Sequence, residues 1–111
     1  MKRVDRKAAV AAYREREIET GIYAVRCVPT GAIWVGQSPD LSKIQNRLWF
    51  TLRLGNNTHR SLQEAWRAEG ADAFTFEILE RLENEEIDYV RARLLQERLS
   101  HWADKLQAPR I

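Results

Sequence analysis

Residues 21–36 read GIYAVRCVPTGAIWVG, and this stretch decides the fold. Two runs rich in β-branched and aromatic residues, 22–28 and 32–36, lie on either side of the sequence PTG at 29–31. β-Branched and aromatic residues favour extended strands, while proline and glycine favour a reversal of the chain. The stretch therefore predicts a β-hairpin.

Two helices are expected after the hairpin. Ser38-Pro39-Asp40 offers a capping residue and a proline ahead of a helix over about 41–53, which ends at Gly55-Asn56-Asn57. Its apolar residues recur at helical spacing, at Leu41, Ile44, Leu48 and Leu52. The sequence SLQE at 61–64 has the form of a capping box and predicts a shorter helix that ends at Gly70.

The remaining segments complete an α+β pattern. Phe74, Phe76 and Ile78 alternate with polar residues, so 73–80 is expected to be a strand with one buried face. Asn84 is expected to cap a last helix over about 85–107, and 3–18 is expected to form a solvated leading helix. The order predicts a small three-stranded, mainly antiparallel sheet flanked by helices, with a helical extension at 1–19 and one domain at 20–108.

Composition excludes several classes of protein. The chain has 111 residues, 44% hydrophobic and 31% charged, which suits one domain with a core and a solvated surface. It has no apolar run near the ~20 residues of a membrane span, and no export signal is visible. A single cysteine, Cys27, excludes an internal disulfide, and His59 and His101 lack zinc-finger spacing. We therefore expect a soluble cytoplasmic protein.

The net charge of +2 conceals an uneven distribution along the chain. Residues 1–60 hold 11 basic and 5 acidic side chains, whereas 61–111 hold 7 basic and 11 acidic ones. Between 21 and 60 the only acid is Asp40. The basic residues of that segment are Arg26, Lys43, Arg47, Arg53 and Arg60. A polyanion can approach such a surface without meeting carboxylates, so nucleic acid becomes a candidate partner, although basic and acidic elements can also simply attract each other.

Gly21-Ile22-Tyr23, followed after ten residues by Trp34-Val35-Gly36, resembles the paired motif of the GIY-YIG nuclease superfamily. The resemblance continues through the glycine-asparagine loop at 55–57, the Leu62-Gln63 pair and the strand at 74–80, and it covers about residues 20–102. Members of this superfamily cleave DNA phosphodiester bonds with one divalent metal ion. The resemblance implies a small endonuclease that uses Mg²⁺ or Mn²⁺.

The resemblance assigns water activation to Tyr23. The free pKa of tyrosine, near ~10, requires that nearby cations or metal-bound water lower the cost of phenolate formation. Trp34 stands where the family usually has its second tyrosine. An indole has one N–H donor and cannot relay a proton, so Trp34 is expected to orient a phosphate or to pack. Tyr89 offers another hydroxyl from the last helix, although core packing or a surface position suits it better.

Arg47 is the candidate for the phosphate-binding arginine that the resemblance implies. A guanidinium is planar, permanently charged and able to give paired hydrogen bonds to phosphate. A match without gaps assigns the position to Ile44, about one turn earlier, so we expect Arg47 to point from the same helix face at the sheet. Lys43 and Arg53 are the alternatives, and together with Arg60 they are candidate DNA contacts.

Glu97 is the candidate metal ligand that the resemblance implies on the last helix. It is the only carboxylate within 94–102 and precedes two apolar residues, so it is expected at the margin of the buried stripe. A hard Mg²⁺ or Mn²⁺ suits one carboxylate with water and phosphate. Glu85 and Glu86 are alternatives. His59 is a candidate proton acceptor or phosphate contact, or else part of a helix cap.

Two functions follow from the sequence. One is a metal-dependent DNA endonuclease, and the other is a nuclease fold without catalysis that binds nucleic acid or protein. Convergence of Tyr23, Arg47 and Glu97 on one concave surface favours the first, whereas scattered side chains favour the second. The preference for a DNA structure, the choice between DNA and RNA, and the oligomeric state stay open.

Overall fold

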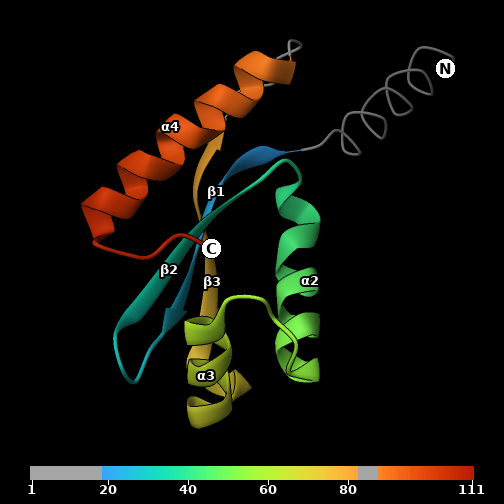
Figure 1. Cartoon of the computed structure of the whole chain (residues 1–111), viewed down its shortest axis with the longest axis vertical. Helices are drawn as coiled ribbons and strands as arrows, with labels where there is room; N and C mark the ends of the chain where they lie inside the picture. The colour runs from blue at the N-terminus through green and yellow to red at the C-terminus, as the bar shows by residue number, and fades with distance from the viewer. Residues whose placement is uncertain (1–18, 83–87) are drawn as a thin grey trace, which may run out of the picture.

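The computed structural model describes residues 19–82 and 88–111, and it confirms the α+β fold (Figure 1). The elements in chain order are β1 (Thr20–Cys27), β2 (Ala32–Ser38), α2 (Leu41–Leu54), α3 (Arg60–Glu69), the short 3₁₀ helix η1 (Ala71–Ala73), β3 (Phe74–Leu82) and α4 (Asp88–Leu106). The predicted helix at 3–18 and the predicted cap at Asn84 lie outside the described residues. Within the described ranges, no helix is both long and apolar enough to cross a membrane.

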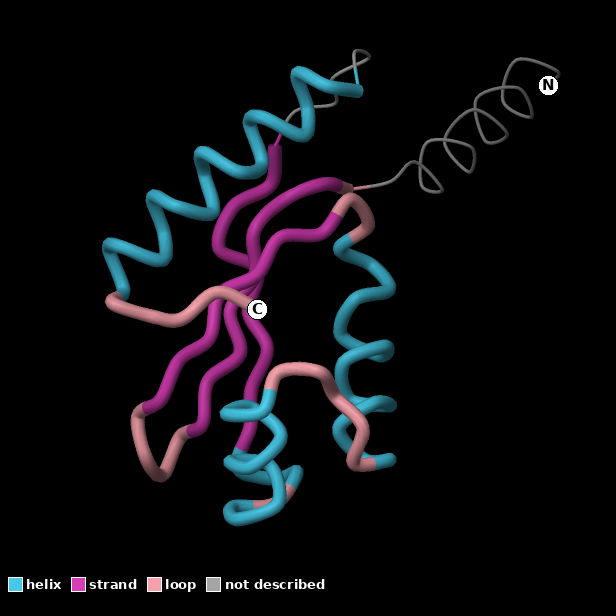
Figure 2. Tube along the Cα trace, viewed as in Figure 1, coloured by secondary structure: helices cyan, strands magenta, loops and turns pink. Residues whose placement is uncertain are grey.

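The three strands form one antiparallel sheet in the order β2-β1-β3, so β1 is central (Figure 2). The predicted hairpin is confirmed: β1 and β2 pair from Gly21 opposite Ser38 to Cys27 opposite Ala32. Gly31 adopts φ 79° in the turn, a left-handed conformation that glycine reaches without steric cost. Its N–H donates to the Cys27 carbonyl at 2.8 Å.

Alternation along β1 sends neighbouring side chains to opposite faces of the sheet. Tyr23, Val25 and Cys27 pack in a core with residues of α2 and α3, whereas Ile22 packs in a second core with residues of α4. Figure 1 shows α4 on one side of the sheet and α2 on the other. The sheet therefore separates two cores, each covered by its own helices.

Helix α2 has the ends that its sequence predicts. The Asp40 side chain accepts a hydrogen bond from the Ser42 N–H at 3.1 Å and caps the N-terminus. Gly55 adopts φ 80° and its N–H reaches back to the carbonyls of Leu52 and Thr51, which closes the C-terminus. Leu41, Leu48 and Leu52 are buried and set the face of α2 that packs on the sheet.

The predicted capping box of α3 is wrong. The helix begins at Arg60 with His59 at its N-cap, and no side chain caps it. Ser61 lies inside the first turn, where its hydroxyl accepts a hydrogen bond from the Trp34 indole at 2.9 Å. The buried Gln63 instead holds the preceding loop, since its amide accepts from the Asn57 N–H and donates to the Leu52 carbonyl.

The last residues of the chain cover part of the outer edge of β2. Val35 N–H donates to the Pro109 carbonyl at 3.0 Å, and Ile111 N–H donates to the Val35 carbonyl at 2.8 Å. Arg110 thereby forms a parallel bridge with Val35. Because these bonds satisfy backbone groups of an edge strand, they leave less of β2 open to pairing with another chain.

Candidate functional site

Tyr23 is a core side chain that depends on the glycine of the second motif. It is 3% exposed and stacks on Phe76 with ring centroids 5.3 Å apart. Gly36 lies opposite Tyr23 on β2, and a Cβ at position 36 would collide with the Tyr23 hydroxyl. The two motifs are therefore coupled through packing, because the phenol ring occupies the space that a side chain at position 36 would need.

Burial has an electrostatic consequence for Tyr23. Loss of solvent around the phenol raises the pKa of Tyr23 to about 12. Ionisation at neutral pH is therefore harder than for a free tyrosine, since a phenolate is poorly stabilised in an apolar core. Use of Tyr23 as a base would require a cation close to its hydroxyl.

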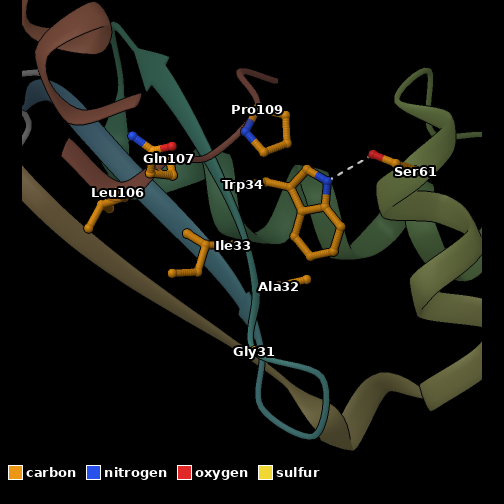
Figure 3. A pocket seen from close by; sticks show the side chains of 8 residues that line it. All are labelled: Gly31, Ala32, Ile33, Trp34, Ser61, Leu106, Gln107 and Pro109. Atoms are coloured by element: carbon orange, nitrogen blue, oxygen red, sulfur yellow. Dashed lines mark hydrogen bonds between the residues drawn. The ribbon is translucent and has the colours of Figure 1, made fainter. Parts of the chain in front are cut away.

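Trp34 has a packing role with one polar contact. It is 4% exposed, lies tilted against Phe74 at 6.2 Å between ring centroids, and donates its indole N–H to Ser61. It also lines a surface pocket between β2, α3 and the C-terminal segment (Figure 3). The described lining residues are Gly31, Ala32, Ile33, Trp34, Ser61, Leu106, Gln107 and Pro109. None of them is ionisable, so this pocket offers no acid or base.

Arg47 lies on the outward side of α2, and the prediction that it points at the sheet is wrong. Its side chain is exposed, while the inward positions are held by buried leucines. Ile44, the position that a match without gaps assigns to the arginine, is half-buried and packs against the core. The position on α2 that matches the phosphate-binding arginine is therefore occupied by an apolar side chain, Ile44. The guanidinium of Arg47 faces solvent.

Glu97 lies on α4, the helix that covers the face of the sheet opposite Tyr23. Its side chain is 61% exposed, and its Oε2 atom lies 3.6 Å from Arg93 Nε one turn earlier. The core positions of α4 next to it belong to Leu95 and Leu99. Glu97 also lines a surface hollow with Val90, Arg93 and Leu94, so it lies beside the apolar stripe with its carboxylate in solvent.

The described residues contain no metal site built from several protein ligands. Across 19–82 and 88–111, no three or more His, Cys, Asp or Glu side chains gather in a way that can hold a metal ion. The alternatives Glu85 and Glu86 lie outside the described residues. A divalent cation at Glu97 would therefore depend on water and substrate phosphate for its remaining ligands and would compete with Arg93 for the carboxylate.

The remaining basic candidates gather around α2 and the loop that follows it. Lys43, Arg53 and Arg60 are exposed. Arg60 and Arg67 line a polar hollow beyond the end of α2, and Arg67 Nη2 donates to the Gly55 carbonyl at 3.1 Å. His59 is half-buried at the start of α3, where its N–H donates to Asn57 Oδ1 at 2.9 Å. Its imidazole has no capping role.

The structure adds two residues that the sequence patterns did not single out. Phe50 and Leu54 are each 59% exposed on α2, close to the basic residues. The signal was present in the sequence: neither residue belongs to the periodic set that predicts the buried face of this helix. Large apolar residues out of phase with the core mark a surface whose role packing does not explain.

Comparisons with known proteins identify the fold. No protein-family model and no curated protein matches the chain. Among solved structures, the catalytic domain of the homing endonuclease I-TevI superposes with a TM-score of 0.70 at 25% sequence identity, over 83% of this chain and 97% of that domain. A mutant form of the same domain also gives 0.70, at 26% identity over 81% and 86%. Together with the paired motif, this similarity places the chain in the GIY-YIG superfamily.

Proposed function

We propose that this chain is a nucleic-acid-binding domain that keeps the GIY-YIG nuclease fold and binds phosphates through α2 and the α2–α3 loop without hydrolysing them. The observation that carries the proposal is that the exposed cations gather on one surface, whereas the two candidate catalytic side chains lie on opposite faces of the sheet. Exposed cations lie along 43–60 with no carboxylate between Asp40 and Glu64, while Tyr23 and Glu97 belong to opposite faces of the sheet. Attraction of phosphates needs only the first feature, whereas metal-assisted hydrolysis needs a convergent site.

The two described sides of the molecule differ in what they offer a phosphate backbone. The surface of α2 offers Lys43, Arg47 and Arg53 without an acid. On α4, by contrast, the exposed Arg93 faces Glu97. Cations without neighbouring carboxylates keep their full attraction for a polyanion, so α2 is the better binding surface.

The binding test uses a fluorescently labelled oligonucleotide and measures anisotropy over a range of salt concentrations. We expect salt-sensitive binding, and we expect a Lys43→Ala/Arg47→Ala double variant to weaken it and to lower the salt slope by roughly one to two. The matched control, Arg93→Ala/Lys105→Ala, removes the same charge from α4 and should bind almost as the parent protein does. Equal weakening by both variants, or no binding at low salt, would contradict the proposal.

The hydrolysis test incubates the protein with supercoiled plasmid and Mg²⁺ or Mn²⁺. We expect no nicking above that of protein-free controls. DNA hydrolysis is the second candidate function, favoured by the fold match to a catalytic domain and by Tyr23 in the first motif. Metal-dependent nicking that disappears in Tyr23→Phe would establish it and overturn our proposal. Nicking that persists in Glu97→Ala would remove Glu97 from the mechanism.

A further inference from the structure

Four exposed side chains form a row along the outward side of α2, which we call the α2 stripe: Lys43, Arg47, Phe50 and Leu54. Their spacings of four, three and four residues place successive members on one helix face. At 1.5 Å per residue the row is about 16 Å long. All four side chains are exposed, so the described elements leave this side of α2 uncovered. The stripe is therefore a continuous surface with two cations at one end and two apolar groups at the other.

The orientation of the stripe follows from the helix period. At about 100° per residue, its members fall within an arc of roughly 60°, on the side of α2 away from the buried Leu48 and Leu52. Phe50 thus points away from the core, and its ring makes none of the aromatic contacts that the described core rings make. Burial of Phe50 requires a partner from outside the described part of the chain.

The surroundings of Phe50 identify the chemistry of that partner. The apolar pair lies in a segment, 41–63, that has basic residues and no acidic one. An occupant that suits it combines a flat apolar surface with negative charge at close spacing. Unpaired bases on a phosphodiester backbone have both features, because every base has a face that stacks on an aromatic ring while the phosphates contact the cations. A regular duplex keeps its base faces inside the stack and cannot offer them to Phe50.

We propose that the α2 stripe binds a single nucleic-acid strand, with an unpaired base stacked on Phe50, the neighbouring phosphates on Lys43 and Arg47, and Leu54 extending the apolar surface. This inference rests on the proposed nucleic-acid binding and makes it specific, since it names unpaired strands as the preferred ligand. Positive charge alone would favour the duplex, whose charge density is higher. Preference for a single strand must therefore come from the exposed ring.

The test measures anisotropy with one sequence prepared as single-stranded DNA, single-stranded RNA and duplex DNA. We expect Phe50→Ala to weaken binding of the single strands by roughly tenfold, the size of one lost base-aromatic stack, and to change duplex binding by less than about threefold. Phe50→Tyr keeps a stacking face and should restore the affinity. Tyr89→Ala is the matched control, because Tyr89 is 69% exposed on α4 and its loss should change neither affinity. Comparison of the two single strands shows which sugar is preferred.

The outcomes separate this inference from the proposed function. No binding of any oligonucleotide at low salt would defeat both. If duplex and single strand bind equally, and Phe50→Ala affects both alike or neither, only the role of Phe50 is overturned. Sedimentation measures whether the protein associates with itself. If Phe50→Ala abolishes self-association and leaves strand binding intact, the stripe is a protein interface and the proposal is wrong. Selective loss of single-strand binding that Phe50→Tyr restores supports it.

Discussion

The face of the sheet beneath α2 and α3, which we call the aromatic face, contains a cluster of aromatic rings among its leucines, whereas the buried residues of the core beneath α4 are all aliphatic. On the first face, Tyr23 stacks on Phe76, and the rings of Trp34 and Trp66 both contact Phe74. The second core is built from Ile22, Val35, Leu95 and Leu99. The first motif tyrosine belongs to one face and the candidate carboxylate to a helix on the other. Retention of a nuclease fold therefore does not by itself retain a nuclease site.

The largest expected effect tests how tightly the aromatic face is built. A Cβ at position 21 would overlap the Glu80 carbonyl of β3, which cannot move without breaking the sheet. We expect Gly21→Ala to lower the free energy of unfolding by about 3 kcal/mol or more, and Gly36→Ala by about 1–3 kcal/mol through the Tyr23 ring. Urea denaturation followed by tryptophan fluorescence measures both.

A matched control for these glycines is Gly31→Asn in the exposed hairpin turn. Position 31 has open space around it and a left-handed conformation that asparagine tolerates. We expect this variant to lose less than about 1 kcal/mol. If Gly21→Ala lowers the free energy of unfolding no more than Gly31→Asn does, then close packing against the Glu80 carbonyl is not the reason for glycine at position 21.

The second effect concerns the buried phenol of the aromatic face. Burial raises the pKa of Tyr23 to about 12, above the ordinary value of 10.0. The unfolded chain loses this proton at lower pH than the folded chain does. The contribution of the protonated Tyr23 phenol to the free energy of unfolding is therefore fully present below pH 10. This contribution, about 2–3 kcal/mol in total, is lost as pH rises toward 12. Unfolding free energies measured across this range should fall less steeply in Tyr23→Phe, and an unchanged slope would show that Tyr23 titrates normally.

A smaller effect distinguishes two carboxylates of β3. Glu80 Oε1 accepts from Arg98 Nε at 2.8 Å and from the Trp102 indole at 2.9 Å, which joins β3 to α4. Partial burial alone raises the pKa of Glu80, but the hydrogen bonds from Trp102 and Arg98 outweigh it and hold the pKa below its ordinary value. We expect Glu80→Gln to cost about 1 kcal/mol near neutral pH.

The pH dependence of Glu80 has a definite sign. Since its folded pKa is lowered, its contribution is present above the ordinary value of 4.5 and is lost as pH falls below it. The parent protein and Glu80→Gln should therefore approach each other in stability under acid. Glu77→Gln is the control, because the Arg26–Glu77 pair is more exposed and contributes about 0–1 kcal/mol. An equal loss in the free energy of unfolding for Glu80→Gln and Glu77→Gln would contradict the stronger role of Glu80.

The smallest effect is expected at Glu97. Its solvated pair with Arg93 should contribute little, so Glu97→Gln is expected to change the free energy of unfolding by less than about 0.5 kcal/mol. Oligonucleotide affinity should also stay the same or rise slightly, since one negative charge is removed. A large loss of stability or of binding would show that this carboxylate has a partner outside the described residues.

Much of the fold followed from local patterns. The hairpin, α2 with its caps, and β3 are determined by alternation, helical spacing and turn residues that lie close together in the chain. The capping box at 61–64 failed for a non-local reason: the Ser61 hydroxyl is engaged by Trp34, 27 residues away. A local motif cannot indicate that a distant strand will take its polar group.

The candidate site was less predictable than the fold. Arg47 precedes the buried Leu48 by one residue, and a helix rotation of about 100° separates an inward from an outward side chain. The face that Glu97 takes depends on how α4 docks across the sheet, which is a property of packing between distant segments. Residue type and approximate spacing suggested roles, but neither determined the direction of these side chains.

By itself, the sequence determined the order of strands and helices, the family resemblance carried by the two motifs, and the basic character of 21–60, because these depend on residues near one another in the chain. Only the tertiary structure decided that the Tyr23 ring packs directly against Gly36 and that Arg47 and Phe50 share an outward stripe. It also decided that Glu97 lies across the sheet from Tyr23. Each of these depends on which face of an element packs, and packing is decided by the whole core at once.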